Sequence, residues 1–268
     1  MLLAFDLDNT IVTREHTLPE EIIFTLNRVR AEGHHITVLT GRPPIATQQF
    51  LDLLDINEYY STNHGAYVVG KEGELMRWQK LEPATLQGVM KPFLDNPDIE
   101  YACIENDVLF VRNPDDERWN WAHTQSRTVK LFDVSRELNA EKVVFTSDAL
   151  GNEVQTHLDN HYPELITYAW NNNYIEVTSP KSDKGSALAL IAEELGIPQN
   201  KVIAFGDGPN DTTMLNWAGQ GIAVGPYAHT DTLAVANEHI DSPENLGVVS
   251  WLEQNLLGKA RQAEFSLQ

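Results

Sequence analysis

The sequence predicts a doubly wound α/β fold, in which a separate α+β lobe is inserted into a core built on a parallel sheet. Short apolar runs at 1–5, 36–39 and 202–205 each end at polar residues, as buried parallel strands do. A segment with helical periodicity connects the first two runs and makes a parallel crossover. Between 81 and 180 the pattern changes to short strands interleaved with helices, which indicates the inserted lobe.

Composition narrows the class of protein. The 268 residues are 42% hydrophobic, enough to bury a sizeable core as one large or two smaller domains. With 39 acidic and 19 basic residues the formal net charge is -20, which argues against nucleic-acid binding and does not favour an anionic membrane surface. No apolar run approaches the roughly 20 residues that span a bilayer.

The start of the chain and its cysteine content predict where the protein works. The single cysteine, Cys103, cannot form an internal disulfide, which fits a reducing compartment, and we interpret it as a core or strand residue. Met1 leads directly into the first strand, which leaves no room for a signal peptide. We therefore expect a soluble, cytoplasmic protein.

The first strand opens into Phe5-Asp6-Leu7-Asp8-Asn9-Thr10. Asp6 and Asp8, two positions apart in extended backbone, point the same way. Like charges this close repel unless a cation or a reacting group separates them, so the pair predicts a partner. The alternative is an ordinary acidic turn, and the rest of the chain must decide between the two readings.

The first crossover follows this turn. Thr17-Leu18-Pro19-Glu20 has the spacing of a helix capping box, the helix is expected over 19–32, and Gly33 ends it before the strand at 36–39. Only 32 positions separate Asp8 from Thr40 (40 − 8), which is room for the crossover alone. Any lid over the site must therefore be inserted elsewhere.

Thr40-Gly41-Arg42 closes the second strand, and Pro43-Pro44 begins a helix through Leu54. A threonine hydroxyl at a strand end, followed by a glycine that lets the backbone approach closely, suits a phosphoryl oxygen. The alternative is a helix N-cap before Pro43.

The inserted lobe is predicted from turn signals and local periodicity. A strand over 59–62 and a hairpin over 66–78 precede it. Trp119, Trp121, Tyr168 and Trp170 are interpreted as packing within the lobe, with a substrate pocket as the alternative. The expected elements of the lobe are helices at 83–90 and 152–160 and strands at 101–104, 108–111, 142–146, 166–170 and 174–178.

Two further polar segments follow the lobe. Lys184-Gly185 opens a helix, where a lysine opposes the macrodipole and an anionic ligand would reconcile the two; Lys181 is the competing candidate. The strand at 202–205 then leads into Gly206-Asp207-Gly208-Pro209-Asn210-Asp211, which brings a second acidic pair to the sheet edge that carries Asp6.

These four segments, in this order, resemble the motifs of the haloacid dehalogenase superfamily of aspartate-nucleophile phosphohydrolases. The resemblance covers the whole chain and implies a Rossmann-like core over 1–80 and 181–268. It also implies that 81–180 is a C2-type cap, as in the Cof-like branch, subfamily IIB.

The resemblance implies a role for each matching residue. Asp6 would be the nucleophile that forms an aspartyl phosphate, and Asp8 would protonate the leaving alkoxide and then activate water. Thr40 and Lys184 would stabilise the charge that develops on the phosphoryl oxygens. The Mg²⁺ ligands would be Asp6, Asp8 through its backbone carbonyl, Asp207 and Asp211, and the substrate-binding set would be Thr40, Gly41, Arg42, His64, Lys184 and Asn210.

Two positions depart from the pattern of the relatives. His64, in Asn63-His64-Gly65-Ala66, stands where the usual residue is Asn, so a structural role for it is open beside a substrate contact. Asn9 stands where Gly is most frequent, which predicts a left-handed backbone there. The absence of a His or Cys cluster at the predicted site favours Mg²⁺ over zinc.

We therefore expect a Mg²⁺-dependent phosphatase that acts on a small phosphorylated metabolite, of the sugar phosphate class. Asp8 favours phosphoryl chemistry, because dehalogenases of the superfamily lack the second aspartate. The alternatives are a sugar phosphomutase of the same superfamily and a catalytically silent metabolite-binding protein. The scattered aromatic residues show no interface stripe, and the oligomeric state stays open.

Overall fold

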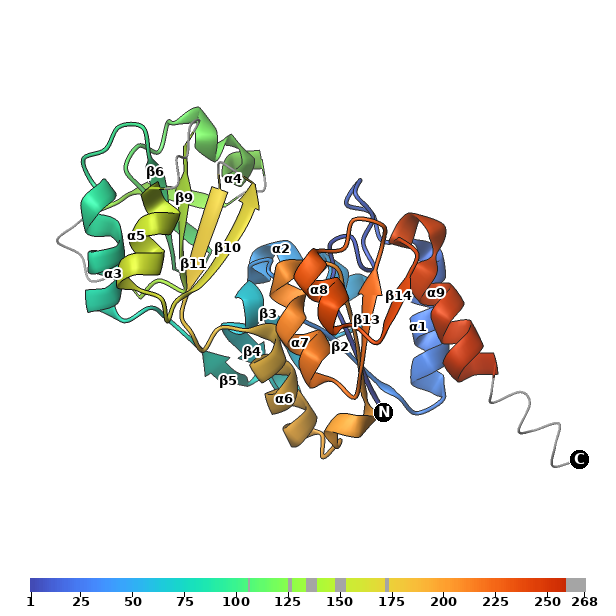
Figure 1. The fold of residues 1–268 in the computed structure, drawn as a ribbon. Coiled ribbons are helices and arrows are strands. Elements are labelled where there is room, and N and C mark those ends of the chain that lie inside the picture. The colour runs from blue at the N-terminus through green and yellow to red at the C-terminus, as the bar shows by residue number, and fades with distance from the viewer. Residues whose placement is uncertain (106, 125–126, 134–138, 148–152, 172–173, 259–268) are drawn as a thin grey trace, which may run out of the picture. The chain divides into compact units, whose positions relative to one another are not determined.

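The computed structural model describes residues 1–105, 107–124, 127–133, 139–147, 153–171 and 174–258 (Figure 1). The chain forms two compact units. The core unit comprises Met1–Pro43, Thr47–Arg77 and Asp183–Gln268, and the inserted unit comprises Pro44–Ala46 and Trp78–Ser182. Among the described residues, no helix combines the length and the apolar character needed to cross a membrane.

The core unit is built on a five-stranded parallel sheet with the order β14-β13-β12-β1-β2, which confirms the predicted fold class. β1, the first strand of the chain's first crossover, lies between β12 and β2. β14 has no counterpart in the prediction, because its three residues are too polar and exposed to give an apolar run. The strands are β1 (Leu2–Phe5), β2 (His35–Val38), β12 (Val202–Gly206), β13 (Gln220–Val224) and β14 (Glu238–Ile240).

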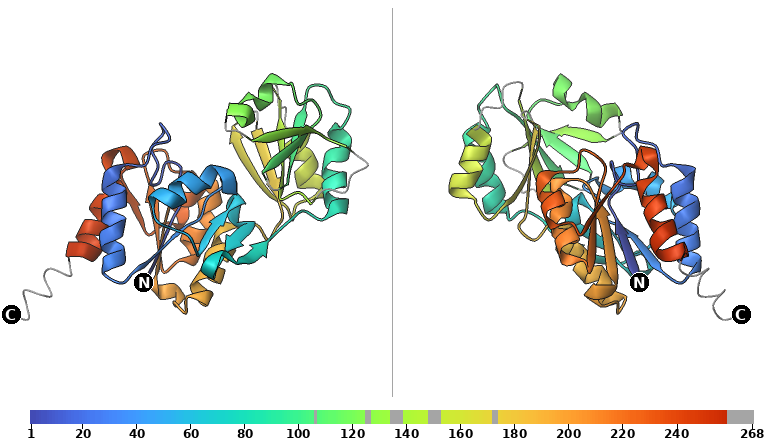
Figure 2. Two further views of the ribbon diagram at one scale, coloured as in Figure 1. Left: turned by 180° about the vertical axis from the view of Figure 1, so that it is seen from behind. Right: turned by 45° about the vertical axis from the view of Figure 1, so that its right-hand side comes forward.

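Helices cover both faces of this sheet (Figures 1 and 2). Leu3 and Phe5 of β1 face one hydrophobic cluster, to which α1 and α9 contribute, and Leu2 and Ala4 face the other, to which α6 and α7 contribute. Because successive side chains of a strand point to opposite faces of the sheet, β1 contributes residues to both hydrophobic clusters. The helices are α1 (Glu20–Ala31), α2 (Pro44–Leu53), α6 (Lys184–Glu194), α7 (Thr212–Trp217), α8 (Thr230–Val235) and α9 (Gly247–Leu252).

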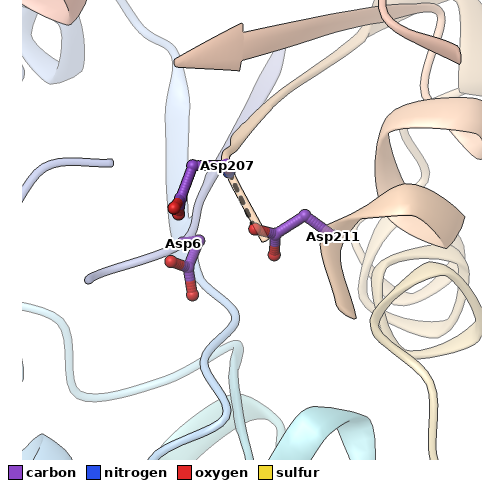
Figure 3. A group of neighbouring side chains, drawn as sticks. All are labelled: Asp6, Asp207 and Asp211. Atoms are coloured by element: carbon purple, nitrogen blue, oxygen red, sulfur yellow. Dashed lines mark hydrogen bonds between the residues drawn. The ribbon is translucent and has the colours of Figure 1, made fainter. Parts of the chain in front are cut away.

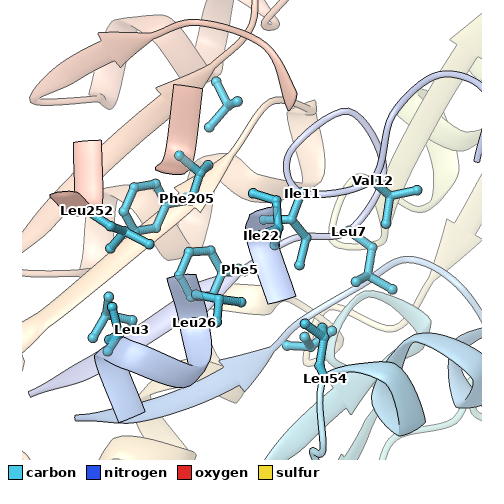
Figure 4. Close-up of a cluster of buried hydrophobic side chains, with 14 of the residues drawn as sticks. Leu3, Phe5, Leu7, Ile11, Val12, Ile22, Leu26, Leu54, Phe205 and Leu252 are labelled. Atoms are coloured by element: carbon cyan, nitrogen blue, oxygen red, sulfur yellow. The ribbon is translucent and has the colours of Figure 1, made fainter. Parts of the chain in front are cut away.

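The cluster under α1 and α9 is built around two stacked rings (Figure 4). Phe5 and Phe205, paired in register on β1 and β12, have ring centroids 4.8 Å apart and an interplanar angle of 11°. Trp251 of α9 meets Phe205 edge to face, with centroids 5.3 Å apart. This packing holds the two central strands together directly beneath the residues that follow them.

The start of α1 differs from the prediction. The capping box at 17–20 does not form: Pro19 occupies the N-cap position and makes no side-chain cap. The Thr17 hydroxyl lies 2.7 Å from that of Thr13 instead. The reason is conformational, because the extended backbone of Pro19, with ψ 139°, places the N-cap two residues beyond Thr17 and the helix begins at Glu20. Gly33, with φ +82°, ends the helix region as predicted.

A small sheet with the order β3-β4-β5 follows α2. Its strands are β3 (Tyr60–Thr62), β4 (Tyr67–Val69) and β5 (Leu75–Trp78). The turn between β3 and β4 carries Asn63 and His64, both with positive φ, 48° and 58°. Several short helical turns complete the chain, at Asn63–Gly65, Lys71–Gly73, Lys91–Phe93, Glu117–Trp119, Gln199–Lys201, Pro209–Asp211 and Pro243–Asn245, with a π-turn at Glu253–Leu257.

The inserted unit contains a six-stranded sheet with the order β10-β11-β9-β6-β7-β8. α3 (Pro83–Met90) and α5 (Glu153–His161) pack on one face, and α4 (Asn120–Thr124) packs on the other. Neither α4 nor β8 was predicted, and Asn152, the expected first residue of α5, lies outside the described residues. The strands are β6 (Glu100–Glu105), β7 (Val108–Val111), β8 (Thr128–Leu131), β9 (Lys142–Thr146), β10 (Ile166–Asn171) and β11 (Tyr174–Thr178).

Some aromatic residues of the inserted unit are buried, and others are partly exposed. Trp119 is fully buried against β6 and β7, and Trp121 packs beside it, as predicted. Tyr168 is buried, whereas 42% of Trp170 is exposed. Cys103 is buried on β6, and burial raises the pKa of its thiol.

Candidate active site

The predicted site residues of the core unit gather at the carboxyl ends of three adjacent strands. Asp6 and Asp8 follow β1, Thr40 follows β2, and Asp207 follows β12. The backbone N–H of Asp6 donates to the Phe205 carbonyl at 3.0 Å and extends the strand pairing by one residue. Parallel strands present their carboxyl ends at one sheet edge, so residues far apart in sequence meet there.

Three carboxylates form a compact cluster at this edge (Figure 3). One oxygen each of Asp6, Asp207 and Asp211 lies within 4.8 Å of the other two. Asp211 is fixed by its second oxygen, which accepts the backbone N–H groups of Asp207 at 2.9 Å and Gly208 at 2.8 Å. Gly206 leaves the room for it, because a Cβ there would lie 2.7 Å from Asp211 Oδ2.

Lys184 inserts its ammonium group between two of these carboxylates. Its Nζ donates to Asp6 Oδ1 and to Asp211 Oδ1, both at 2.5 Å, and the side chain is 0% exposed. It begins α6, whose N-cap is Asp183, the carboxylate acceptor for the Ser186 N–H at 2.8 Å. Burial lowers the pKa of Lys184, but the charges of Asp211 and Asp6 outweigh it and raise the pKa above its ordinary value. Lys181 is exposed.

The cluster carries excess negative charge. Burial raises the pKa of Asp6 well above its usual value, although Lys184 opposes the shift. Burial and the charge of Asp211 raise the pKa of Asp207 to about 7. Fully ionised, three carboxylates and one ammonium group sum to two negative charges (−3 + 1). That sum matches a divalent cation, and an all-oxygen donor set matches Mg²⁺, so the residues present fit the metal that the sequence predicts.

The Asp8 carboxylate is engaged elsewhere, by Arg42. Arg42 donates from Nε to Asp8 Oδ2 at 2.7 Å and from Nη2 to Asp8 Oδ1 at 2.5 Å. The guanidinium lies 4.6 Å from the centroid of the Phe50 ring. Burial raises the pKa of Asp8, but the hydrogen bonds and charge of Arg42 outweigh it and hold the pKa below its usual value. Arg42 was predicted as a substrate contact, and the structure places it on Asp8.

Two further polar residues complete the site edge. Thr40 is buried, and its hydroxyl accepts the Arg42 N–H at 3.1 Å. Thr10, to which the sequence analysis gave no role, donates its hydroxyl to Asp207 Oδ1 at 3.2 Å. The signal was present, because Thr10 is the last residue of the first motif. Asn9 has φ 56°, the left-handed backbone predicted for it.

Gly41, His64 and Asn210 also come together. The His64 ring lies against Gly41, and His64 Nδ1 is 3.1 Å from Asn210 Nδ2. The structure thus brings the predicted site residues together in three groups. The first group contains Asp6, Asp207, Asp211 and Lys184. The second contains Asp8 and Arg42, and the third contains Gly41, His64 and Asn210.

The chain is similar to known proteins over most of its length. A family model described as haloacid dehalogenase-like hydrolase matches residues 3–252. A 5-amino-6-(5-phospho-D-ribitylamino)uracil phosphatase of Bacillus subtilis is 25% identical, over 94% of this chain and 96% of the relative. An HMP-PP phosphatase of Cronobacter sakazakii is 28% identical, over 83% of each chain.

Two solved structures share the fold. A HAD subclass IIB sugar phosphatase superposes with a TM-score of 0.80 and 22% identity, over 94% of this chain and 98% of the other. A haloacid dehalogenase-like hydrolase from Bacteroides thetaiotaomicron superposes with a TM-score of 0.79 and 20% identity, over 94% of this chain and 98% of the other.

Proposed function

This chain belongs to the haloacid dehalogenase-like hydrolases and is a phosphatase, and we propose that it uses Mg²⁺ to hydrolyse phosphate monoesters of small metabolites, of the sugar phosphate class, through an aspartyl phosphate. The observation that carries the proposal is the cluster of Asp6, Asp207 and Asp211 with Lys184 buried against it. We further propose that the inserted unit is the C2-type cap, which would select the leaving group.

The chain supplies its own ligands for the metal. Asp6, Asp207 and Asp211 would hold Mg²⁺ through side-chain oxygens, and Asp8 would add its backbone carbonyl. When bound, Mg²⁺ would neutralise charge on the phosphoryl oxygens and on the carboxylates around them.

Asp6 and Asp8 divide the covalent chemistry. The Asp6 carboxylate attacks phosphorus, the bond from phosphorus to the leaving oxygen breaks, and the Asp8 carboxyl gives its proton to that oxygen. Asp8, now ionised, takes a proton from water as the water attacks the aspartyl phosphate, which releases inorganic phosphate and restores both aspartates. Lys184, the Thr40 hydroxyl and the Gly41 amide hold the phosphoryl oxygens.

In this scheme Arg42 orients Asp8. A planar guanidinium that donates two hydrogen bonds to one carboxylate fixes the direction of that carboxylate better than a single contact does. Because the same contact lowers the pKa of Asp8, it favours the ionised form that activates water and opposes the protonated form that the first step uses. We expect Arg42→Lys to lower kcat by about 10- to 100-fold, the equivalent of the 1.5–3 kcal/mol typical of a hydrogen bond to a charged group.

The proposal is tested by phosphate release from a panel of sugar phosphates and nucleotides, with and without Mg²⁺. We expect turnover only with Mg²⁺, and none in Asp6→Asn, because the amide is not a nucleophile of the required strength. Asp231→Asn is the matched control, since its exposed carboxylate belongs to the same unit. Isomerisation of the substrate without phosphate release would establish a phosphomutase instead, and binding without turnover of any ester would establish a silent binding protein.

Leaving-group dependence tests the role of Asp8 separately. Asp8→Asn cannot protonate an alkoxide, but p-nitrophenolate leaves without a proton. We therefore expect phosphoenzyme formation from p-nitrophenyl phosphate to survive in Asp8→Asn, with slow hydrolysis, while alkyl esters give no phosphoenzyme. Equal loss with both esters, measured by rapid quench, would contradict the assignment of Asp8 as the acid.

A further inference from the structure

We propose that His64 is a positioning residue: its ring ties Asn210, and with it the loop that carries Asp207 and Asp211, to the phosphate-binding strand end at Gly41. This inference rests on the proposed function, because it assigns His64 a part in the same site. It assigns no direct substrate contact to the imidazole.

The backbone around His64 is fastened to the end of β2. The His64 N–H donates to the Thr40 carbonyl at 3.0 Å, and the Asn63 N–H donates to the Arg42 carbonyl at 2.9 Å. Both Asn63 and His64 have positive φ, a conformation that is rare outside glycine and that asparagine and histidine tolerate best among other residues. The strand end therefore sets where the imidazole ring lies.

The ring reaches the loop that carries Asp207 and Asp211 through a hydrogen bond to Asn210. His64 is 1% exposed and Asn210 is 6% exposed, so water does not compete for this contact. An amide nitrogen can only donate, so the Asn210 Nδ2 atom at 3.1 Å requires His64 Nδ1 to accept.

Asn210 connects this hydrogen bond to the acidic cluster. It occupies the short helical turn Pro209–Asp211 and immediately precedes Asp211. Asp211 in turn accepts the Asp207 N–H and is bonded to Lys184. Displacement of Asn210 therefore moves the residue next to it, whose two oxygens hold both the loop and the lysine.

The position of the ring also explains the glycine at position 41. A Cβ built on Gly41 would lie within 3.0 Å of three ring atoms, Cε1, Nδ1 and Nε2 of His64. The sequence pattern predicts that Gly41 allows a phosphoryl oxygen to approach the backbone closely. The packing gives a second, independent reason, because the imidazole occupies the space that a side chain at position 41 would need.

The first test separates positioning from substrate contact. We expect His64→Phe, which keeps a ring but removes the acceptor, to lower kcat about tenfold with KM for the ester nearly unchanged, as the loss of one buried hydrogen bond predicts. Mg²⁺ affinity, measured by calorimetry without substrate, should fall several-fold because the loop is no longer held. His64→Asn offers an amide acceptor and tolerates positive φ, so it should restore most of both losses.

The second test changes the size of the side chains at positions 41 and 64. Gly41→Ala should lower both activity and the melting temperature, and adding His64→Ala should recover part of each loss, because the methyl group then occupies space that the ring has left. If Gly41 serves only the approach of phosphate, the double variant will show the sum of the two single losses. A thermal double-mutant cycle in EDTA measures this coupling without any turnover.

The outcomes distinguish this inference from the proposed function. Wild-type protein that releases no phosphate would refute the proposed function, while calorimetry and the thermal cycle would still decide the role of His64. A His64→Phe variant with raised KM and unchanged kcat and Mg²⁺ affinity would overturn the inference and assign a substrate contact. If His64→Phe does not fold, His64→Asn and the Gly41 cycle give the answer.

Discussion

Lys184 shows how a local conflict in the sequence marks a functional residue. An ammonium group at the start of a helix opposes the macrodipole, so its position predicts an anion beside it. The structure supplies two anions from the chain itself, Asp6 and Asp211. Because the lysine bridges two carboxylates, it both reduces their repulsion and directs one oxygen of each.

Removal of the Lys184 charge should destabilise the metal-free protein. We expect Lys184→Met to lower the free energy of unfolding in EDTA by about 3–5 kcal/mol, since it leaves buried carboxylates without their counter-charge. Lys181→Met is the control, because Lys181 lies three positions earlier and is exposed. It should change the free energy of unfolding by less than about 0.5 kcal/mol. Urea titration measures both. Equal effects would show that the ion pairs contribute nothing to the fold.

Asp207 gives a pH dependence of metal-free stability. Its folded pKa of about 7 is above its unfolded value, so the folded state binds the proton more tightly. The sign follows: stability contributed by this group is present at pH 4, falls as pH rises, and is lost above pH 7. Mg²⁺ competes with that proton, so the Mg²⁺-induced rise in melting temperature should be larger at pH 8 than at pH 5. A shift independent of pH would contradict this.

The starts of α1 and α6 differ in how their first turns are capped. The sequence predicted a capping threonine at Thr17, and the structure shows an N-cap with no side-chain bond at Pro19. At α6 the opposite holds, because Asp183 caps the helix that presents Lys184. Propensity alone does not separate the two, since both segments carry a cap-type residue a short distance before a helical run.

A matched pair of alanine substitutions tests this difference. Asp183→Ala should lower the free energy of unfolding by about 1 kcal/mol, because the Ser186 N–H loses its acceptor. Thr17→Ala removes a hydroxyl that pairs with the Thr13 hydroxyl, and the Thr17 backbone N–H keeps its bond to Thr13 Oγ1. This change should cost less than about 0.5 kcal/mol. Thermal denaturation of both variants decides. A larger loss in Thr17→Ala would restore the predicted capping box.

The whole molecule consists of two units with separate hydrophobic cores. The carboxylate cluster and Lys184 belong to the core unit alone. Ligands stabilise the states and regions that bind them, so Mg²⁺ should act unevenly on the chain.

Hydrogen exchange measured by mass spectrometry tests this separation. Mg²⁺ should slow exchange in core-unit peptides that contain β12 and the loop after it, and leave the strands of the inserted unit unchanged. Phe145→Ala, in the core of the inserted unit, should accelerate exchange there, and Leu26→Ala should do so in the core unit. Acceleration throughout the chain in either variant would show that the two units unfold as one.

The architecture of the core and the identity of its chemical groups follow from local patterns in the sequence. Apolar runs and their polar ends are local patterns, so the strands that carry Asp6 and Asp207 and the helix that begins at Lys184 could be predicted. Edge elements without an apolar run, such as β14, and the short elements β8 and α4 could not, because their residues give no periodic signal.

Which of these groups meet depends on how distant segments pack. Arg42 bonds to Asp8 across 34 positions, and His64 bonds to Asn210 across 146. Such pairs form because the carboxyl ends of parallel strands converge on one edge and because buried polar groups must find partners there. Local sequence patterns therefore predict the chemical role that a residue can have, whereas the packing of distant segments decides which residue becomes its partner.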